Sequence, residues 1–336
     1  DRPIDTVFWG GGTPGLLPAK DLERLGKAIL ARTGQQPLEW TVEMAPSTVK
    51  PEKLRVLQDL GVNRISMGVQ SFQERFLEGL GRLHRPNQIY QAYDFIREAG
   101  FDNVNLDLMI ALPGQEAADL LKDLDEAICL EPEHLSTYCL TFEEDTALWV
   151  KLSQGKIKQD LEKDADLYEL TWSHLTAAGF EHYEISNFAK PGKACLHNLN
   201  TWCMKEWIGV GPSASSQYQG IRYSNAADLD TWLAQAQAPG VNRQQVNHLS
   251  QNDLLEDAVI FGLRMGQGIS LRELQQRFPI ADFRAFIPFF TGLEIEGLVT
   301  FLNSDHAALT LKGKLLADRI AVEILELGEK ATYDQT

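Results

Sequence analysis

The sequence predicts an α/β fold whose parallel sheet forms a barrel. Predicted strands and helices alternate over residues 4–140, and short turns marked by Gly or Pro join them, which is typical of a parallel sheet with right-handed crossovers. Three of these strands have one apolar and one polar face. A doubly wound sheet, the alternative, has helices over both faces and would bury that polar face at a cost, so the pattern favours a barrel.

The first predicted unit is a strand, a glycine-rich loop and a helix. Residues 4–8 are mostly apolar and lead into the loop 9–15, which contains three consecutive glycines. Residues without Cβ let the backbone approach a small polar ligand, so this loop is a candidate binding element. Apolar residues at helical spacing then predict a helix over 18–31, with Pro18 in its first turn.

The same alternation repeats over the following residues. Each predicted strand is a short run rich in apolar or alternating residues, and each predicted helix has apolar residues three or four positions apart. We expect strands at 38–44, 64–70, 103–110 and 134–140, and helices at 51–60, 73–80, 86–99 and 117–130.

The pattern changes after residue 141. A long amphipathic helix is expected at 160–178 and a strand at 180–185, followed by an irregular stretch to about residue 224. The C-terminal part is expected to hold helices at 253–265, 270–277, 281–296 and 313–327, with two strands at 298–302 and 308–311, an order that resembles a winged helix. The predicted domains are therefore the barrel (1–185), a segment that covers the substrate (186–249) and a helical domain (250–336).

Composition excludes several classes of protein. The net charge of -16 argues against nucleic acid as a partner, because Lys and Arg supply most of that affinity. The sequence has neither a long apolar stretch suited to a membrane span nor a basic-then-apolar signal pattern, so we expect a cytoplasmic protein. Its four cysteines form no C-x-x-C pair, which predicts reduced thiols and no structural zinc site.

The loop also satisfies the pattern G-x-G-x-x-G at Gly10, Gly12 and Gly15, which is found in nicotinamide dinucleotide enzymes. In that fingerprint the glycine turn opens directly into a helix that holds the pyrophosphate. Here Pro14 follows the glycines and the helix is expected only from about Pro18. A nicotinamide-dependent oxidoreductase therefore stays an alternative.

Polar residues at matching positions of successive strands form the strongest candidate site. Glu43, Gln70 and Asp107 lie on the polar faces of three strands, and we expect them at the same depth. Each needs a partner if it is buried, either a salt bridge or a ligand. Arg82, a little further along the chain, is a candidate clamp for a carboxylate, because a guanidinium presents two parallel donors.

These motifs occur in one order that resembles a known family. They are Gly10-Gly11-Gly12-Thr13-Pro14, Glu43-Met44-Ala45-Pro46, the run from Arg64 to Phe72, Gly81-Arg82-Leu83-His84, the run from Asn105 to Gly114, Glu184-Ile185-Ser186-Asn187-Phe188-Ala189, His197-Asn198-Leu199-Asn200-Thr201-Trp202 and Gly209-Val210-Gly211. The chain is similar to the radical S-adenosylmethionine (radical SAM) family that contains oxygen-independent coproporphyrinogen III oxidase and its shorter relative, the heme chaperone HemW.

The resemblance implies a partial (βα)6 radical-SAM barrel with a C-terminal helical, winged-helix-like domain. The expected strands leave one βα unit of that barrel out, and we place the missing unit before residue 1. In the family this unit carries a C-x-x-x-C-x-x-C loop whose thiolates hold a 4Fe-4S cluster. No such motif occurs in the sequence.

The resemblance also implies site residues. Gly11, Gly12 and Thr13 are expected at the methionine part of S-adenosylmethionine, while Glu43, Gln70, Arg82 and Asp107 are expected around its ribose and carboxylate. Thr141 is a candidate near the adenine, and His197 is a candidate heme contact.

The His197-Asn198 motif favours the chaperone branch, although Thr201 stands where that branch has Tyr. That branch implies heme or another tetrapyrrole as cargo and a heme-accepting protein as partner. The alternative is the oxidase, which decarboxylates two propionates of coproporphyrinogen III.

Overall fold

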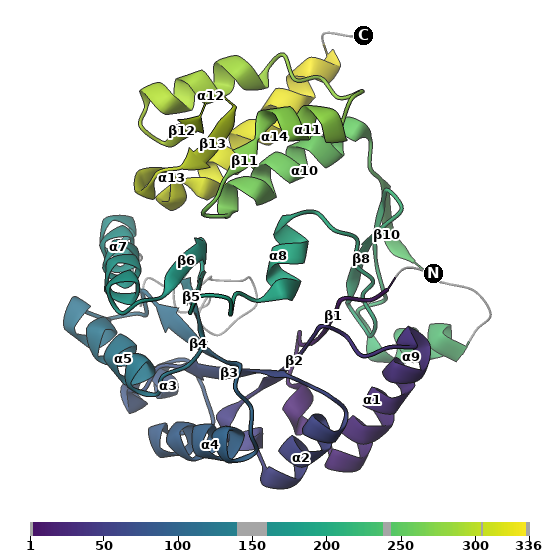
Figure 1. The fold of residues 1–336 in the computed structure, drawn as a ribbon, viewed down its shortest axis with the longest axis vertical. Helices are drawn as coiled ribbons and strands as arrows, with labels where there is room; N and C mark the ends of the chain where they lie inside the picture. Colours follow the sequence, from purple (N-terminus) through teal and green to yellow (C-terminus); the bar gives the residue numbers. More distant parts are fainter. Residues whose placement is uncertain (1–2, 140–159, 238–242, 304, 334–336) are drawn as a thin grey trace. The chain divides into compact units, whose positions relative to one another are not determined.

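The computed structural model describes residues 3–139, 160–237, 243–303 and 305–333 (Figure 1). The chain divides into two compact units, residues 1–197 and 198–336. This division falls twelve residues after the barrel boundary expected from the sequence, because the larger unit also includes the first residues of helix α8 (Leu196–Trp202) and the turn before it.

A seven-stranded sheet forms the larger unit, in the order β1-β2-β3-β4-β5-β7-β6. Its first five strands are parallel neighbours: β1 (Thr6–Trp9), β2 (Glu39–Met44), β3 (Arg64–Gln70), β4 (Val104–Ile110) and β5 (His134–Cys139). The short strands β6 (Glu181–Glu184) and β7 (Asn187–Ala189) are antiparallel to each other, and β7 is antiparallel to β5. The structure confirms the five parallel strands and adds an antiparallel edge.

Helices cover the convex side of this curved sheet (Figure 1). They are α1 (Ala19–Thr33), α2 (Pro51–Asp59), α3 (Glu74–Gly79), α4 (Pro86–Glu98), α5 (Ala117–Cys129) and α7 (Leu161–Ala177), with single 3-10 turns at Pro14–Leu16 and Pro46–Thr48. Proline occupies the first position of α2 and α4, where no intrahelical partner is needed for its missing N-H. Helices on one face confirm the curled half-barrel and exclude the doubly wound sheet.

The main core lies between the convex side of the sheet and these helices. Val42, Ile65, Leu106 and Leu135 are fully buried there, one from each of four neighbouring strands. The next residue along each strand points to the opposite, concave side, as the pleat requires. The sequence pattern of apolar and polar alternation therefore places the polar side chains inside the curve.

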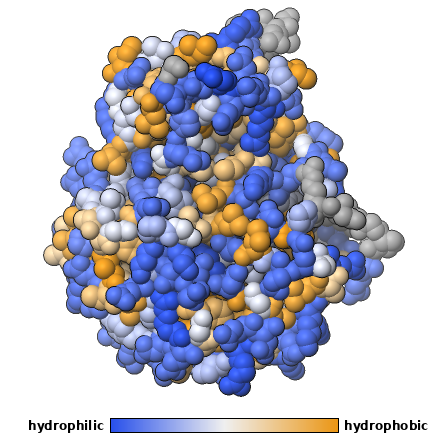
Figure 2. Space-filling model, in the orientation of Figure 1, coloured by the Kyte–Doolittle hydropathy of each residue, from blue (hydrophilic) through white to orange (hydrophobic). Residues whose placement is uncertain are grey.

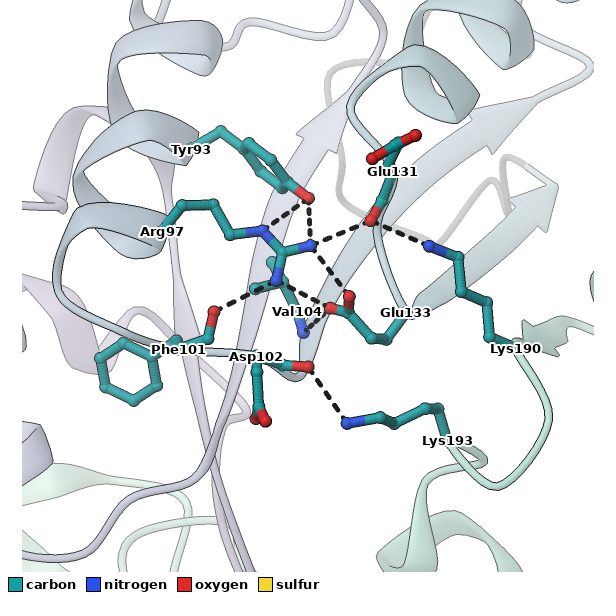
Figure 3. Close-up of polar contacts among 9 residues, drawn as sticks. All are labelled: Tyr93, Arg97, Phe101, Asp102, Val104, Glu131, Glu133, Lys190 and Lys193. Atoms are coloured by element: carbon teal, nitrogen blue, oxygen red, sulfur yellow. Dashed lines mark hydrogen bonds and ion pairs between the residues drawn. The ribbon is translucent and has the colours of Figure 1, made fainter.

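A polar cluster around Arg97 ties the loops at the amino ends of β4 and β5 (Figure 3). The guanidinium of this α4 residue donates to both carboxylate oxygens of Glu133, at 3.0 and 3.1 Å, and to the Tyr93 hydroxyl. It also donates to the carbonyls of Phe101 and Glu131. Because its donors reach two loops and a helix, Arg97 fixes the end of the sheet opposite the glycine loop.

The smaller unit contains two further sheets. The helix α8 (Leu196–Trp202) crosses the boundary between the units, and a three-stranded antiparallel sheet follows, with β8 (Ser215–Tyr218), β9 (Ile221–Ser224) and β10 (Gln244–His248). Helix α9 (Leu229–Gln237) lies between β9 and β10 in the chain.

The expectation of an irregular stretch over 186–224 was therefore wrong. Strands β8 and β9 are only four residues long and polar, so no apolar alternation marks them. The turn between them, Gln219-Gly220, has both residues at positive φ, as a two-residue hairpin requires.

The C-terminal part follows the predicted order of three helices, two strands and a final helical segment. It comprises α10 (Gln251–Arg264), β11 (Ile269–Ser270), α11 (Leu271–Arg277), α12 (Phe286–Ile295), β12 (Val299–Asn303), β13 (His306–Leu309), α13 (Leu311–Leu315) and α14 (Ala317–Tyr333). The two-residue strand β11 adds a third strand beside β13, and the single helix predicted at 313–327 is two helices. None of the helices among the described residues is long and apolar enough to cross a bilayer.

Candidate functional site

The concave side of the sheet holds a continuous row of polar residues. Parallel register places Glu43 beside Ser66, Ser66 beside Asn105 and Asn105 beside His134. One step towards the carboxyl ends of the strands, Gly68 lies beside Asp107 and Asp107 beside Ser136. Two adjacent levels of polar side chains therefore line the interior.

Asn105 is the centre of this row. Its amide nitrogen donates to the Ser66 hydroxyl at 2.8 Å and to an Asp107 carboxylate oxygen at 2.7 Å. Its amide oxygen accepts from His134 Nδ1 at 2.6 Å and from the Ser136 hydroxyl at 3.1 Å. Two donors and two acceptors are the full capacity of an amide, so Asn105 locks four neighbours in place.

His134 is a neutral member of the network. Burial, with the positive charge of Arg64 adding to it, holds the pKa of its imidazole well below the usual range. An amide oxygen only accepts, so Nδ1 carries the proton, and Nε2 accepts from the Tyr183 hydroxyl at 2.8 Å. His134 thus orients Asn105 and carries no charge itself.

Glu43 joins the polar row to the glycine loop. Its carboxylate accepts from the Gly11 backbone N-H at 3.1 Å. A Cβ at Gly10 would lie 2.6 Å from the Glu43 carboxyl carbon, so only glycine permits this approach. Burial and the nearby charge of Asp107 raise the pKa of Glu43 to about 7, although the Gly11 N-H opposes the rise.

The rest of the loop is open. Gly11 has φ +78, a left-handed conformation that favours glycine, and neither Gly11 nor Gly12 has an atom within 4 Å of the position of an added Cβ. Thr13 is exposed and immediately precedes the 3-10 turn at Pro14–Leu16. A ligand can therefore reach the backbone of this loop, as the sequence predicts.

Asp107 lies at the centre of the second level. Burial raises its pKa, while hydrogen bonds from Asn105, Ser136 and Ser66 and the positive charge of Arg64 oppose the rise. Since Asp107 and Glu43 influence each other's charge, a ligand that donates hydrogen bonds to either would stabilise the ionised pair.

Gln70 ends β3 in an unusual conformation. Its φ is +70, and its side-chain amide lies 3.0 Å from the position of a Cβ at Gly68, so Gly68 leaves room for it. Asp123 of α5 fixes the next two residues by accepting from the Ser71 hydroxyl at 2.7 Å and from the Phe72 N-H at 2.9 Å. Asp123 thus holds the backbone next to Gln70 and so helps to position the Gln70 side chain.

The expectation of one common depth was wrong in detail. Glu43 lies level with Ser66 and Asn105, Asp107 lies one level higher, and a register shift places Gln70 beside Leu108. The three residues share the concave face but occupy successive levels. Alternation of polar residues along a strand shows which face of the sheet a side chain is on. Its level on that face depends on the register with the neighbouring strand.

Two predicted residues lie apart from this row. Arg82 is exposed in the turn after α3, and its guanidinium forms no hydrogen bond or ion pair with any described residue, although its backbone N-H donates to the Leu77 carbonyl at 2.9 Å. Burial of His84 lowers the pKa of its imidazole, and the positive charge of Arg82 adds to this, while the contact of His84 Nε2 with the Val69 carbonyl at 3.1 Å opposes the shift. Thr141 falls outside the described residues.

His197 is anchored at the other end of the concave face. Its Nδ1 lies 3.0 Å from the Thr6 hydroxyl, its backbone N-H donates to Glu39 at 2.9 Å, and its ring stacks on Phe8 at 4.9 Å. Burial lowers the pKa of the imidazole, with the charge of Glu39 opposing the shift. These contacts give His197 a positional role whatever it binds.

Sequence reasoning missed the residues that organise the site. Asn105 and Ser66 were only part of a polar face, and His134 and Asp123 were not considered. A signal existed for His134, because it begins a strand whose alternate residue, Ser136, is polar too. No local signal marks Asp123, which is one acidic residue among several on α5.

The geometry of the glycine loop does not match a dinucleotide fold. The helix α1 begins at Ala19, four residues after Gly15, with Pro18 at its N-cap. Its amino end therefore does not follow directly from the glycines, as pyrophosphate binding in that fold requires.

Comparison with known proteins agrees with this architecture. The model of the radical SAM superfamily matches residues 1–127, and the model of the HemN C-terminal domain matches residues 249–316. Curated heme chaperones named HemW are similar over most of the chain. The protein of Bacillus subtilis is 32% identical over 94% of this chain and 84% of its own, and that of Lactococcus lactis is 36% identical over 96% and 85%.

The chain belongs to the HemW family of radical SAM proteins. The HemW of Escherichia coli is 42% identical over 63% of this chain and 56% of its own. Among solved structures, coproporphyrinogen III oxidase (HemN) from Escherichia coli superposes with a TM-score of 0.79 at 24% identity, covering 96% of this chain and 78% of that one. At this identity the likeness shows the shared fold.

The radical SAM family implies S-adenosylmethionine and a 4Fe-4S cluster as cofactors. The residues of this HemW-family protein fit S-adenosylmethionine. The open backbone at Gly11 and Gly12 and the half-buried carboxyl groups of Glu43 and Asp107 suit the polar groups of such a ligand. The cysteines do not fit the 4Fe-4S cluster in the same way, because the cluster needs three thiolates close together. Cys129, Cys139, Cys195 and Cys203 have other spacings, and the described residues contain no group of metal-ligating side chains.

Proposed function

We propose that this protein is a heme chaperone, which binds heme or a related tetrapyrrole and passes it to an acceptor protein. The observation that carries the proposal is the similarity to HemW chaperones of several bacteria along nearly the whole chain. The alternative, oxidation of coproporphyrinogen III, has less support: a fold shared with HemN at 24% identity, and the match of the HemN C-terminal domain model. A cytoplasmic location is part of the proposal.

Absorption spectroscopy tests heme binding directly. We expect titration of the full chain with heme to shift and sharpen the Soret band and to saturate near one heme per chain. Addition of apomyoglobin should then move the signal to the myoglobin spectrum if heme is transferable. An unchanged Soret band at micromolar protein would refute the proposal.

His197 is the candidate heme contact within this proposal. Its ring borders the concave face through Phe8 and Thr6. If it ligates heme iron, His197→Ala will change the Soret maximum and the spin state as well as the affinity. His248, an exposed residue of β10, supplies the matched control, His248→Ala. A spectrum of His197→Ala identical to that of wild type would exclude His197 as a ligand.

We propose also that the concave face and the glycine loop bind S-adenosylmethionine. Together with a reduced cluster, this cofactor supplies one-electron radical chemistry, and the protein supplies orientation and exclusion of water. Glu43 and Asp107 would accept hydrogen bonds from amine or hydroxyl groups, the loop at Gly11–Thr13 would offer backbone groups, and Gln70 an amide. Arg82 is a candidate partner for the carboxylate, because its guanidinium is exposed and has no ion pair among the described residues.

Substitution of the two carboxylates tests this site. Asp107→Ala and Glu43→Ala should each weaken S-adenosylmethionine binding by more than about 1 kcal/mol, since each removes an acceptor of a charged hydrogen bond. Asp94→Ala changes an exposed carboxylate of α4 and should leave the affinity unchanged. Calorimetric titration measures all three, and wild-type affinity in both site variants would exclude this assignment.

A further inference from the structure

Arg64 is a buried arginine on the concave face. Its side chain is 2% exposed at the start of β3, and register pairs it with Thr41 of β2, which is fully buried. The neighbours Ile65 and Val42 pack into the core beneath the helices, so Arg64 and Thr41 point to the interior of the curve. They lie one level below Ser66 and Glu43, further from the glycine loop.

Both side chains carry polar atoms without a partner. Arg64 Nε and the Thr41 hydroxyl are buried and have no hydrogen bond in the part of the chain that the structure describes. Within these same residues, no carboxylate forms an ion pair with the Arg64 guanidinium. Burial of a guanidinium without an acceptor is costly, and arginine is normally buried only when it is paired. The arrangement therefore points to an acceptor that the protein does not itself provide.

The surroundings leave the positive charge of Arg64 available to a ligand. It favours the ionised form of Asp107 and the neutral forms of His134 and His197, which places the guanidinium among the residues of the concave face. Asp107 already accepts hydrogen bonds from Asn105 and Ser66. Glu39 accepts from the backbone N-H groups of Leu196 and His197.

We propose that Arg64 and Thr41 form a carboxylate-binding subsite at the base of the concave face. A guanidinium presents two parallel donors that match a carboxylate, and the Thr41 hydroxyl adds a third. The inference rests on the proposed function, because both proposed ligands carry carboxylates. Heme has two propionates, and S-adenosylmethionine has the carboxylate of its methionine part.

Arg64→Met tests the subsite by keeping the length of the side chain and removing its charge. Wild type and variant are titrated with heme, with heme dimethyl ester, whose propionates are masked, and with S-adenosylmethionine. Arg55→Met, which alters an exposed arginine of α2, is the matched control. Thermal unfolding of each ligand-free protein completes the comparison.

If the subsite holds a propionate, wild type will bind heme at least about tenfold more tightly than the ester, a difference of about 1.4 kcal/mol. Arg64→Met will then bind the two equally. If it holds the cofactor carboxylate, Arg64→Met will lose at least about tenfold in S-adenosylmethionine affinity and will still distinguish heme from its ester. Arg64→Lys should keep part of the affinity in either case, because it retains the charge and loses the fork.

Stability separates ligand binding from a structural role. Replacement of an unpaired buried charge by an apolar side chain of similar length should leave the melting temperature unchanged or raise it. A fall of several degrees with parallel loss of every ligand would mean that Arg64 is structural, and unchanged affinity for all ligands would also overturn the subsite. Failure of wild type to bind heme would refute the chaperone proposal, while the S-adenosylmethionine titration would still decide the subsite.

Discussion

The carboxyl group of Glu43 lies between the glycine loop and a second buried carboxyl group. It accepts from the Gly11 N-H and lies close enough to Asp107 for the two charges to oppose each other. Its pKa of about 7 means that it is partly protonated at neutral pH when the protein is folded. A protonated carboxyl group donates as well as accepts, so Glu43 can serve ligands that present either type of group.

This pKa predicts a pH-dependent stability. Glu43 binds its proton more tightly in the folded state than in the unfolded state, where its pKa is about 4.5. Wild type should therefore lose stability relative to Glu43→Gln as the pH rises from about 4.5 to about 7, and the difference should be constant above that. At pH 8 we expect the variant to melt about 2–4 °C higher, as measured by calorimetry.

The control for this measurement is an exposed carboxylate. Glu52→Gln in α2 should give a melting temperature that follows wild type across the whole pH range. A difference between wild type and Glu43→Gln that does not depend on pH would contradict the raised pKa.

At the scale of single residues, the sequence predicted which side chains face the interior. Alternation along β2, β3 and β4 placed Glu43, Ser66 and Asp107 on polar faces, and the structure confirms this. It could not give their levels, because register is set by contacts between strands that are far apart in the chain. The full set of hydrogen bonds around Asn105 likewise needs four strand-borne groups brought together by folding.

At the ends of two strands, secondary-structure packing holds the backbone in an unfavourable conformation next to the site. Gln70, the last residue of β3, and Ala111, which follows β4, both have positive φ, a conformation that residues other than glycine adopt at a cost. After Gln70, Asp123 of α5 accepts two hydrogen bonds that hold the chain in this path. The packing of a neighbouring helix thus stabilises a strand end that local preference would not choose.

At the opposite end of the sheet, the Arg97 cluster likewise stabilises the loops next to the strands (Figure 3). Helix α4 presents Arg97 to Glu133, whose carboxylate also accepts from the Val104 N-H at the start of β4. The stack of Arg97 on Tyr93, 4.9 Å from the ring centroid, adds a cation-π contact. The cluster links the end of a helix to the start of a strand and is partly shielded from water.

Removal of Arg97 should therefore destabilise the fold. We expect Arg97→Ala to lower the free energy of unfolding by about 2–4 kcal/mol, because Glu133 and two backbone carbonyls lose a charged donor. Urea denaturation followed by circular dichroism measures this. Arg85→Ala, which breaks a 3.5 Å ion pair with Glu74 at a well exposed position, should cost less than about 0.5 kcal/mol. Equal effects of the two substitutions would show that the cluster contributes no more than an ordinary surface pair.

For the whole molecule, the net charge is a better predictor of nucleic-acid binding than the order of helices and strands. The C-terminal part has the order of a winged helix, which is found in DNA-binding proteins. The net charge is -16, however, and hydrophilic residues cover most of the face seen in Figure 2. Phosphate backbones require a basic surface, so this order of elements does not by itself predict nucleic-acid binding.

A heparin column tests this conclusion. We expect the protein to pass through without retention at about 50 mM salt, where electrostatic attraction is screened least. Lysozyme, a basic protein, serves as the control for the column. Elution of this protein above about 300 mM salt would reveal a local basic surface that the net charge conceals.

The sequence by itself determined the class of fold, the parallel strands, the glycine loop and the family. These follow from local features: periodicity, turn residues and motifs in order. It missed the β8–β9 hairpin, whose strands are short and polar. At the edge of the main sheet it predicted the strand at 180–185 but neither β7 nor the antiparallel pairing. Only the tertiary structure decided the levels of Glu43, Gln70 and Asp107, the links made by Asn105 and Asp123, and the burial of Arg64 Nε without a hydrogen bond among the described residues. Those depend on register and burial, which arise when strands distant in the chain pack side by side.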